Sequence, residues 1–190
     1  HWRALALGCR DMSDCQAPST GGFANLFTDD TSEITRQIDR FQARGGGDEP
    51  ENLLDALYRI AEDISWPHQA GKAHRIVVVF TDATTKEELD PGTASGDRSY
   101  NKIIDIYSRG HFKLFLYGID SAIYRTLGER IPKSVFFPQG NDYREVMANL
   151  QKTGFEKVME QLARSVSGAS DILTEEMLDA GSGGAPIDLS

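Results

Sequence analysis

Short apolar runs alternate with amphipathic stretches along most of the chain. The clearest run is Arg75 to Thr81, whose interior reads Ile-Val-Val-Val-Phe and is β-branched at four positions. A continuous apolar run is typical of a strand that is covered on both faces, as the strands of parallel sheets are. We therefore expect this strand to be parallel and central in its sheet.

Four other segments are predicted strands. Arg3 to Cys9, Phe112 to Tyr117 and Ser134 to Phe137 are short and mainly apolar, and Phe23 to Phe27 is predicted as a short edge strand after a polar loop. The run from Arg3 to Cys9 is too short for a helix, so a buried strand is expected there.

Helical periodicity fills the intervals between these strands. Two helices are predicted from capping patterns, one after Asp30-Thr31-Ser32-Glu33 and one after Asp48-Glu49-Pro50-Glu51 that ends near Ser65-Trp66-Pro67. The second carries its apolar side chains on one face. Three more helices are expected: one that carries Ile103, Ile104, Ile106 and Tyr107, one from Ala122 to Arg130, and a longer amphipathic stretch from Tyr143 towards Val166.

Apolar strands separated by amphipathic helices predict a parallel sheet, because each parallel connection must cross one face of the sheet. The expected fold class is α/β, doubly wound, with a mostly parallel sheet and helices on both faces. At 190 residues the chain is of a size for one such domain. No apolar run reaches the length of a membrane span, so membrane insertion is not expected.

Charge and cysteine content exclude several function classes. The net charge of -9 disfavours a nucleic-acid partner, because binding to a phosphate backbone needs clustered Lys and Arg. Two cysteines, Cys9 and Cys15, provide neither a four-ligand zinc pattern nor a disulfide scaffold. The histidines His68, His74 and His111 also lack metal-ligand spacing, and Trp66 is interpreted as a packing residue.

Three carboxylates are expected at one rim of the sheet. Asp82 follows the best strand, and ligands of open α/β sheets bind outside the carboxyl ends of strands. Asp48 and Glu51 follow three glycines, Gly45 to Gly47, which permit backbone turns that other residues avoid. Hard cations take oxygen ligands, and Mg²⁺ commonly uses one or two carboxylates and keeps other positions open. A divalent-cation site is therefore predicted here.

The segments Gly45 to Glu51 (Gly-Gly-Gly-Asp-Glu-Pro-Glu) and Phe80 to Ala83 (Phe-Thr-Asp-Ala) resemble a von Willebrand factor A domain, in the variant of the integrin beta-subunit I-like domain. This family binds Mg²⁺, or Ca²⁺ or Mn²⁺, at a metal-ion-dependent adhesion site and docks an acidic side chain of a protein partner. The resemblance implies that Glu51 and Asp82 ligate the cation and that Asp48 supports a neighbouring calcium site.

The resemblance covers residues 3–168 and implies one von Willebrand factor A domain over residues 1–168. Residues 169–190 are expected to form an extension that is linker-like from residue 181. The family's first strand and its Asp-x-Ser-x-Ser loop have no counterpart in the sequence. Asp11 to Cys15 imitates the loop, but only about thirty residues separate it from Gly45, too few for the intervening elements.

Three functions remain open, and the sequence names no compartment. The expected function is a protein-binding module with a cation site, and not an enzyme. A metal-free scaffold is an alternative, because Asp48 and Glu51 also fit a helix cap and Asp82 also fits an N-cap. The third is a Mg²⁺-dependent phosphotransfer or hydrolase domain that uses Asp82, although G-x-S-x-G, P-loop and dinucleotide motifs are all missing from the sequence.

Overall fold

The computed structural model describes residues 3–8, 27–40, 49–66 and 74–153, together with residues 160 and 164. The side chains of residues 150–153 are not described. The chain divides into two compact units, His1–Val146 and Met147–Ser190. The elements that matter for function belong to the first unit, and the predicted domain boundary at residue 168 lies outside the described residues.

A parallel sheet of three strands organises the first unit. Strands β1 (Arg75–Phe80), β2 (Phe112–Ile119) and β3 (Val135–Gly140) pair in the order β1-β2-β3. Both pairs are parallel, with Val77 opposite Leu114 and Leu116 opposite Phe136. Helices α3 (Tyr100–Arg109) and α4 (Ala122–Arg130) connect the strands. The predicted α/β fold class with a parallel sheet is confirmed.

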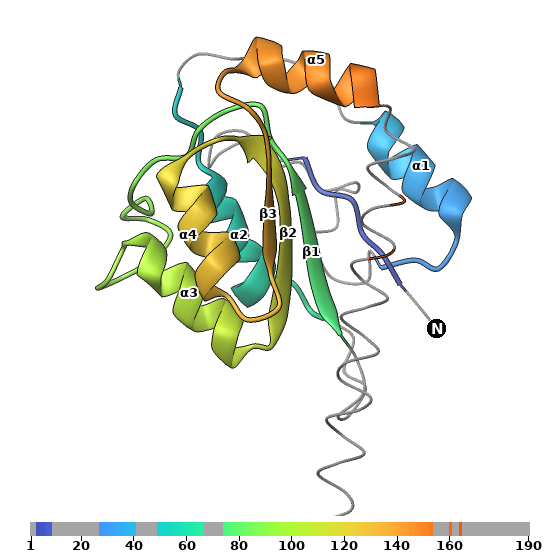
Figure 1. Ribbon diagram of the computed structural model, residues 1–190. Coiled ribbons are helices and arrows are strands. Elements are labelled where there is room, and N and C mark those ends of the chain that lie inside the picture. Colours follow the sequence, from blue (N-terminus) through green and yellow to red (C-terminus); the bar gives the residue numbers. More distant parts are fainter. Residues whose placement is uncertain are drawn as a thin grey trace, which may run out of the picture. The chain divides into compact units, whose positions relative to one another are not determined.

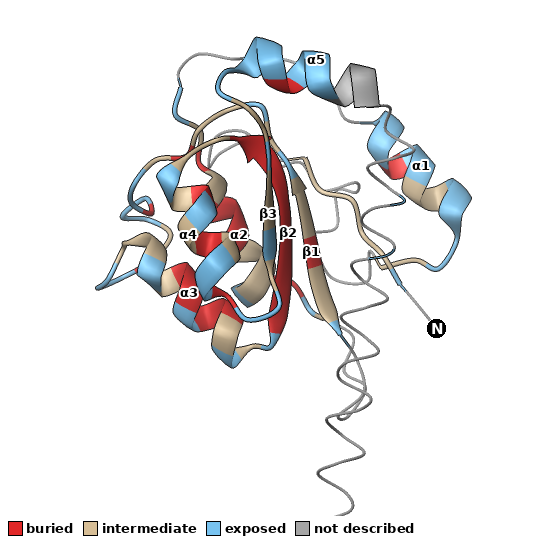
Figure 2. Cartoon of the chain, viewed as in Figure 1, coloured by how far each residue is buried: buried red, intermediate tan, exposed pale blue. Residues whose placement is uncertain are grey.

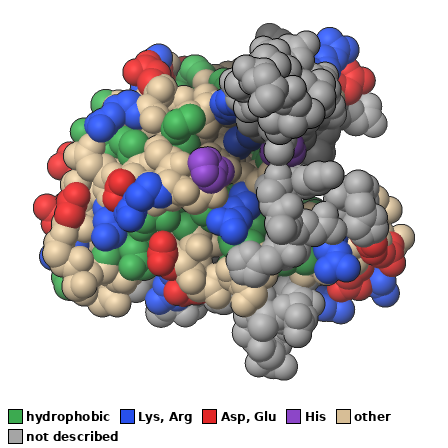
Figure 3. All heavy atoms as spheres, turned by 90° about the horizontal axis from the view of Figure 1, so that it is seen from below, with side chains coloured by type: hydrophobic (Ala, Val, Ile, Leu, Met, Phe, Trp, Pro, Cys, Tyr) green, Lys and Arg blue, Asp and Glu red, His purple; other side chains and the backbone are tan. Residues whose placement is uncertain are grey.

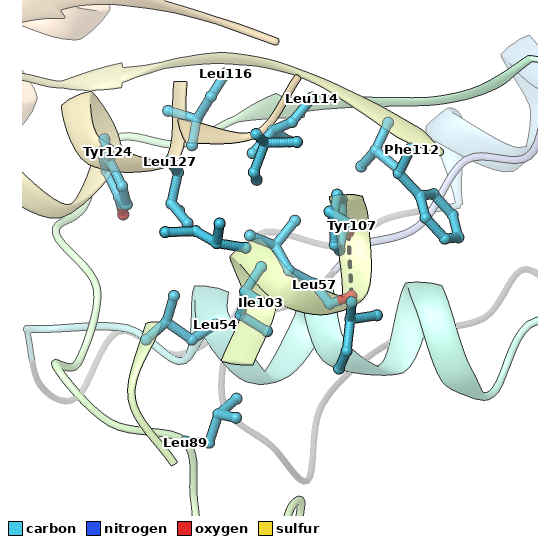
Figure 4. Packing of buried hydrophobic residues seen from close by; sticks show 14 of the residues in the cluster. Leu54, Leu57, Leu89, Ile103, Tyr107, Phe112, Leu114, Leu116, Tyr124 and Leu127 are labelled. Atoms are coloured by element: carbon cyan, nitrogen blue, oxygen red, sulfur yellow. Dashed lines mark hydrogen bonds between the residues drawn. The ribbon is translucent and has the colours of Figure 1, made fainter. Parts of the chain in front are cut away.

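One face of the sheet is covered by helices. Figure 1 shows α2 (Leu53–Glu62), α3 and α4 on the same side of the three strands. Crossovers that step along a sheet in one direction place their helices on one face when they have the usual right-handed sense. Figure 4 shows the layer of side chains between helices and sheet, which includes Leu54, Leu57, Ile103, Tyr107, Leu114, Leu116 and Leu127.

Tyr107 adds a polar contact within this apolar layer. Its hydroxyl donates a hydrogen bond of 3.1 Å to the Leu57 carbonyl, drawn as a dashed line in Figure 4, and so joins α3 to α2. The side chain is fully buried, which raises the pKa of its hydroxyl well above the usual value of 10.0. The hydroxyl is therefore uncharged at physiological pH. Its hydrogen bond to Leu57 offsets the cost of removing a polar group from water.

The prediction that β1 is central is wrong for the described sheet. β2 has a strand on each side and is buried along its full length, whereas β1 lies at an edge and is mostly half-buried (Figure 2). The end of β1 is more open still, since Phe80 is 42% exposed. An apolar run indicates that a strand is covered, but it does not indicate how many strands lie beside it.

The predicted strand Arg3 to Cys9 is also not formed over the described residues 3–8. Ala4 forms an isolated antiparallel bridge with Thr28, and the Ala6 N–H donates to the Gln37 side chain (3.0 Å). Residues 4–8 are half-buried, and only isolated bridge positions, at Ala4 and Gly8, occur within the described part of this segment. The predicted edge strand Phe23 to Phe27 lies outside the described residues except for Phe27.

The capping patterns in the sequence predicted the start of α1 correctly but placed the start of α2 too early. Helix α1 (Thr31–Asp39) begins after Asp30, whose carboxylate accepts from the Ser32 N–H (2.8 Å). Helix α2 begins at Leu53 after Asn52, so the predicted helical turn at Glu51 is wrong. The backbone of Glu51 pairs with Thr85 and is therefore unavailable to the helix.

The remaining boundaries follow the predictions closely. Helix α4 has the predicted limits, β2 continues two residues past Tyr117, and β3 continues from Phe137 to Gly140. Helix α5 (Tyr143–Thr153) starts where predicted, with Asp142 accepting from the N–H groups of Arg144 and Glu145. Beyond Thr153, most of the predicted stretch to Val166 lies outside the described residues.

Trp66 packs as predicted. Its ring lies 5.3 Å from the ring of Phe27 and 5.2 Å from that of Phe112, measured between centroids. The indole N–H donates to the Ile60 carbonyl (2.8 Å), so the one polar atom of the side chain is satisfied. An indole that is enclosed and hydrogen-bonded in this way closes the end of α2 against β2.

Charged side chains of both signs are interspersed on the molecular face shown in Figure 3. Exposed pairs such as Arg109 with Asp105 and Arg36 with Glu33 follow helical spacing. Such pairs contribute little to stability because water screens them. Among the helices of the described residues, none is long and apolar enough to cross a bilayer.

Tyr107→Phe should lower the free energy of unfolding by about 1 kcal/mol, because it removes the buried hydrogen bond to the Leu57 carbonyl and keeps the ring. Urea denaturation of the variant and the unmodified chain measures the difference. The same change at half-buried Tyr58 is the control and should have a smaller effect. Equal effects of the two changes would show that the Tyr107 hydrogen bond does not stabilise the packing of α3 on α2.

Candidate functional site

Asp82 lies directly beyond the carboxyl end of β1, as the sequence predicts. The Thr81 N–H still donates to the Tyr117 carbonyl (2.9 Å), which continues the hydrogen bonding of the sheet by one residue. Asp82 then leaves the sheet and its side chain is exposed. The carboxyl ends of parallel strands are where open α/β sheets bind ligands.

A tight turn at Thr81 sets the direction of the chain around Asp82. The Thr81 hydroxyl accepts from the Ala83 N–H (3.3 Å) and lies 3.2 Å from the Ala83 carbonyl, to which it donates. Gly118 on β2 makes room for this turn, because a Cβ atom there would lie 2.6 Å from Thr81 Cγ2 and 3.0 Å from its carbonyl oxygen. Thr81, which precedes Asp82, thus contacts both Ala83 on the far side of Asp82 and Gly118 on β2.

Glu51 lies beside the loop that carries Asp82. Its N–H donates to the Thr84 carbonyl and its carbonyl accepts from the Lys86 N–H, both at 2.9 Å. These bonds form an isolated parallel bridge between Glu51 and Thr85. The Oε2 atom of Glu51 is buried. The structure therefore brings the Glu51 segment and the Asp82 loop together, although they lie about thirty residues apart in the sequence.

Glu49 is a further carboxylate at this rim. Its Oε1 atom accepts from the Thr84 N–H (3.2 Å) and from the Thr84 hydroxyl (3.3 Å). Glu49 was not among the predicted ligands, although it lies inside the Gly45 to Glu51 motif. Its position between Asp48 and Glu51 was the available signal.

Tyr124 on α4 also contacts the loop that carries Asp82. Its hydroxyl donates to the Ala83 carbonyl (2.9 Å), and the residue is 0% exposed. Burial raises the pKa of Tyr124, a hydrogen bond with Thr81 opposes the rise, and the charges of Glu49 and Glu51 add to it. The hydrogen bond to the Ala83 carbonyl places the hydroxyl at the loop that follows β1. Nothing in the sequence pattern marks Tyr124, because only the fold brings α4 to this loop.

The carboxylate oxygens at this rim are the type of ligand that a hard divalent cation prefers. Glu51 and Asp82 offer carboxylate oxygens, and Mg²⁺ sites commonly use one or two carboxylates, with water filling other positions. Within the described ranges, no group of three or more His, Cys, Asp or Glu side chains is arranged to hold a metal. Asp48 and Gly45 to Gly47 lie outside the described residues. Glu51 and Asp82 are thus the described residues that could contribute carboxylate ligands, and the cation site itself stays a prediction.

His74 and His111, the two histidines among the described residues, are not part of this rim. His74 precedes β1 and His111 precedes β2, so both lie at the opposite, amino end of the strands, and both are exposed. His111 adopts a positive φ of 54° in the turn between α3 and β2. Both residues thus lie on the surface beside the starts of strands, and His68 lies outside the described residues.

Gly118→Ala should destabilise the protein by roughly 1–3 kcal/mol, because the added methyl group meets the backbone and side chain of Thr81. Urea denaturation measures the loss. Gly92→Ala is the control, since its Cβ atom would meet only the side-chain oxygen of Asp90 at 3.2 Å. A Gly118 variant no less stable than the Gly92 variant would contradict the close approach of β2 to the turn at Thr81.

Comparison with known proteins adds no family assignment. No protein-family model matches the chain, and no curated protein matches it either.

Proposed function

We propose that this chain is a protein-binding module that holds a divalent cation, with Mg²⁺ preferred, and docks an acidic side chain of a partner protein. One observation carries the proposal. The Glu51–Thr85 bridge sets the Glu51 segment against the loop after β1, so that two oxygen-ligand residues occupy the carboxyl end of a parallel strand. The resemblance of these two segments to the von Willebrand factor A domain points to the same function.

The chemistry of the rim explains why a cation would be required. Glu49, Glu51 and Asp82 make this rim acidic, and like charges repel an approaching carboxylate. A bound cation supplies the positive charge that accepts the partner's carboxylate oxygen. Asp82 is exposed, so it remains accessible from solvent, whereas the Glu51 Oε2 atom is enclosed. In this proposal the enclosed Glu51 carboxylate and the exposed Asp82 carboxylate would be the two protein ligands of the cation.

By the resemblance, Asp48 would stand beside these ligands and support a second, calcium site. The role of the protein residues in this proposal is to bind and to orient. Binding of this kind breaks no covalent bond, and the proposal assigns no catalytic residue. Any remaining coordination positions are left to water and to the partner.

A metal-free scaffold is the second candidate. It is favoured by the hydrogen bonds that already hold the rim, since Glu49 accepts two from Thr84 and the Glu51 backbone makes two more. A rim held by these bonds is organised without any ion. The two candidates therefore differ in whether the cation changes the protein's stability and its binding.

Asp82→Ala should abolish a Mg²⁺-dependent rise in the thermal midpoint. A ligand that binds only the folded state stabilises it by about 2.7 kcal/mol at a hundredfold excess over its dissociation constant. Differential scanning calorimetry with and without millimolar Mg²⁺ measures the effect. Glu87→Ala is the matched control, because Glu87 is an exposed carboxylate of the same loop. It should keep the Mg²⁺-dependent rise of the unmodified chain.

Two results would overturn the proposal. An unchanged midpoint in Mg²⁺, together with partner binding that survives a chelator, would establish the metal-free scaffold instead. Phosphatase or ATPase turnover that requires Mg²⁺ and disappears in Asp82→Ala would instead establish the Mg²⁺-dependent hydrolase or phosphotransfer function.

A further inference from the structure

Residues Glu51 to Asp55, which lead into the first turn of α2, are joined by hydrogen bonds to the loop after β1. We call this set the helix–loop contact: it comprises Glu51 N–H to Thr84 carbonyl (2.9 Å), Lys86 N–H to Glu51 carbonyl (2.9 Å), Leu54 N–H to Thr85 Oγ1 (3.3 Å) and Asp90 N–H to Asp55 Oδ1 (2.9 Å). Two of the four involve the side chains of Thr85 and Asp55. Both side chains are almost fully enclosed.

Thr85 acts as a helix cap supplied from outside the helix. The first N–H groups of an α-helix have no intrahelical partner and need an acceptor. Asn52 occupies the N-cap position of α2, but its side chain makes no capping hydrogen bond. The Thr85 hydroxyl accepts from the Leu54 N–H instead, and Thr85 is only 6% exposed. The start of α2 therefore depends on the position of the loop.

Asp55 fixes the far end of the same loop. It lies in the first turn of α2, where the partial positive charge of the helix terminus favours a carboxylate. Its Oδ1 atom accepts from the Asp90 N–H and the residue is 2% exposed. A buried carboxylate is costly to leave without hydrogen bonds, so detaching Asp90 from it is unfavourable.

Asp82 lies between two fixed points of the backbone. On one side Thr81 is bonded to β2, and on the other Thr85 is bonded to α2. Between them, Tyr124 holds the Ala83 carbonyl. A loop that is already fixed loses little conformational entropy when it binds a ligand, and preorganisation of this kind strengthens binding.

We propose that Thr85 is a positioning residue for the cation ligand Asp82, so that cation binding and the capping of α2 strengthen each other. The inference rests on the proposed function, because it concerns the same cation site. Coupling between two events is reciprocal: whatever the helix–loop contact adds to cation affinity, the cation adds to the stability of the contact.

Isothermal titration of the intact chain with Mg²⁺ tests the proposal through three variants. Thr85→Val keeps the shape of the side chain and removes the acceptor, so Mg²⁺ affinity should fall by roughly tenfold. Thr85→Ser restores a hydroxyl and should recover most of the affinity. Thr84→Val is the matched control: it makes the same chemical change at the neighbouring residue, where only the exposed bond to Glu49 is lost, and affinity should stay within about twofold.

A second measurement uses the unmodified chain and so does not depend on any variant folding. The Leu54 amide proton should exchange more slowly with solvent when Mg²⁺ is added, because the bound cation favours the capped state. The Ile104 amide, in the middle of α3, is the internal reference for changes in global stability.

The outcomes separate the two proposals. Absence of Mg²⁺ binding by the unmodified chain would overturn the proposed function, and this inference with it. Mg²⁺ binding that is equally strong in Thr85→Val and Thr84→Val, even if Thr85→Val melts at a lower temperature, would overturn only the positioning role. Thr85 would then be a structural cap. An unchanged Leu54 exchange rate at saturating Mg²⁺ would lead to the same conclusion.

Discussion

The backbone bridge between Glu51 and Thr85 is the interaction on which the candidate site depends. It joins two segments that the sequence separates, and it does so through main-chain groups, so its geometry is largely independent of side-chain identity. The bridge draws Glu51 out of α2, sets the acidic segment 49–51 against the loop after β1, and brings Thr85 under the first turn of the helix. The sheet provides the support, because β1 delivers the loop and β2 holds its first residue.

The arrangement of the elements was predictable because burial and periodicity are local signals. The apolar runs at Arg75 and Phe112 and the capping pattern at Asp30 each gave an element close to its observed limits. The edge position of β1 within the described sheet was not predictable, since the pattern reports that a strand is covered and not what lies beside it. The start of α2 was predicted too early because Pro50 and Glu51 are residue types that commonly begin a helix. In the structure the Glu51 backbone instead pairs with Thr85, and α2 begins at Leu53.

The candidate site was predictable in part, for the same reason. Motif and strand end point to Glu51 and Asp82, and the structure sets their segments side by side, whereas their role as cation ligands stays a prediction. Tyr124 and Thr85 were missed because each acts through one long-range hydrogen bond, to the Ala83 carbonyl and from the Leu54 N–H respectively. No periodicity or spacing encodes such a bond. Asp48 lies outside the described residues, so its assignment still rests on the resemblance.

The central claim is that one cation is held between Glu51 and Asp82 at the end of β1. Its most direct test is titration with Mn²⁺, which replaces Mg²⁺ and broadens the nuclear magnetic resonance signals of nearby amides. We predict that the amide signals of Glu49, Glu51 and residues 81–85 broaden first and that excess Mg²⁺ reverses the effect. Broadening centred elsewhere, or spread evenly over the acidic surface, would contradict the claim.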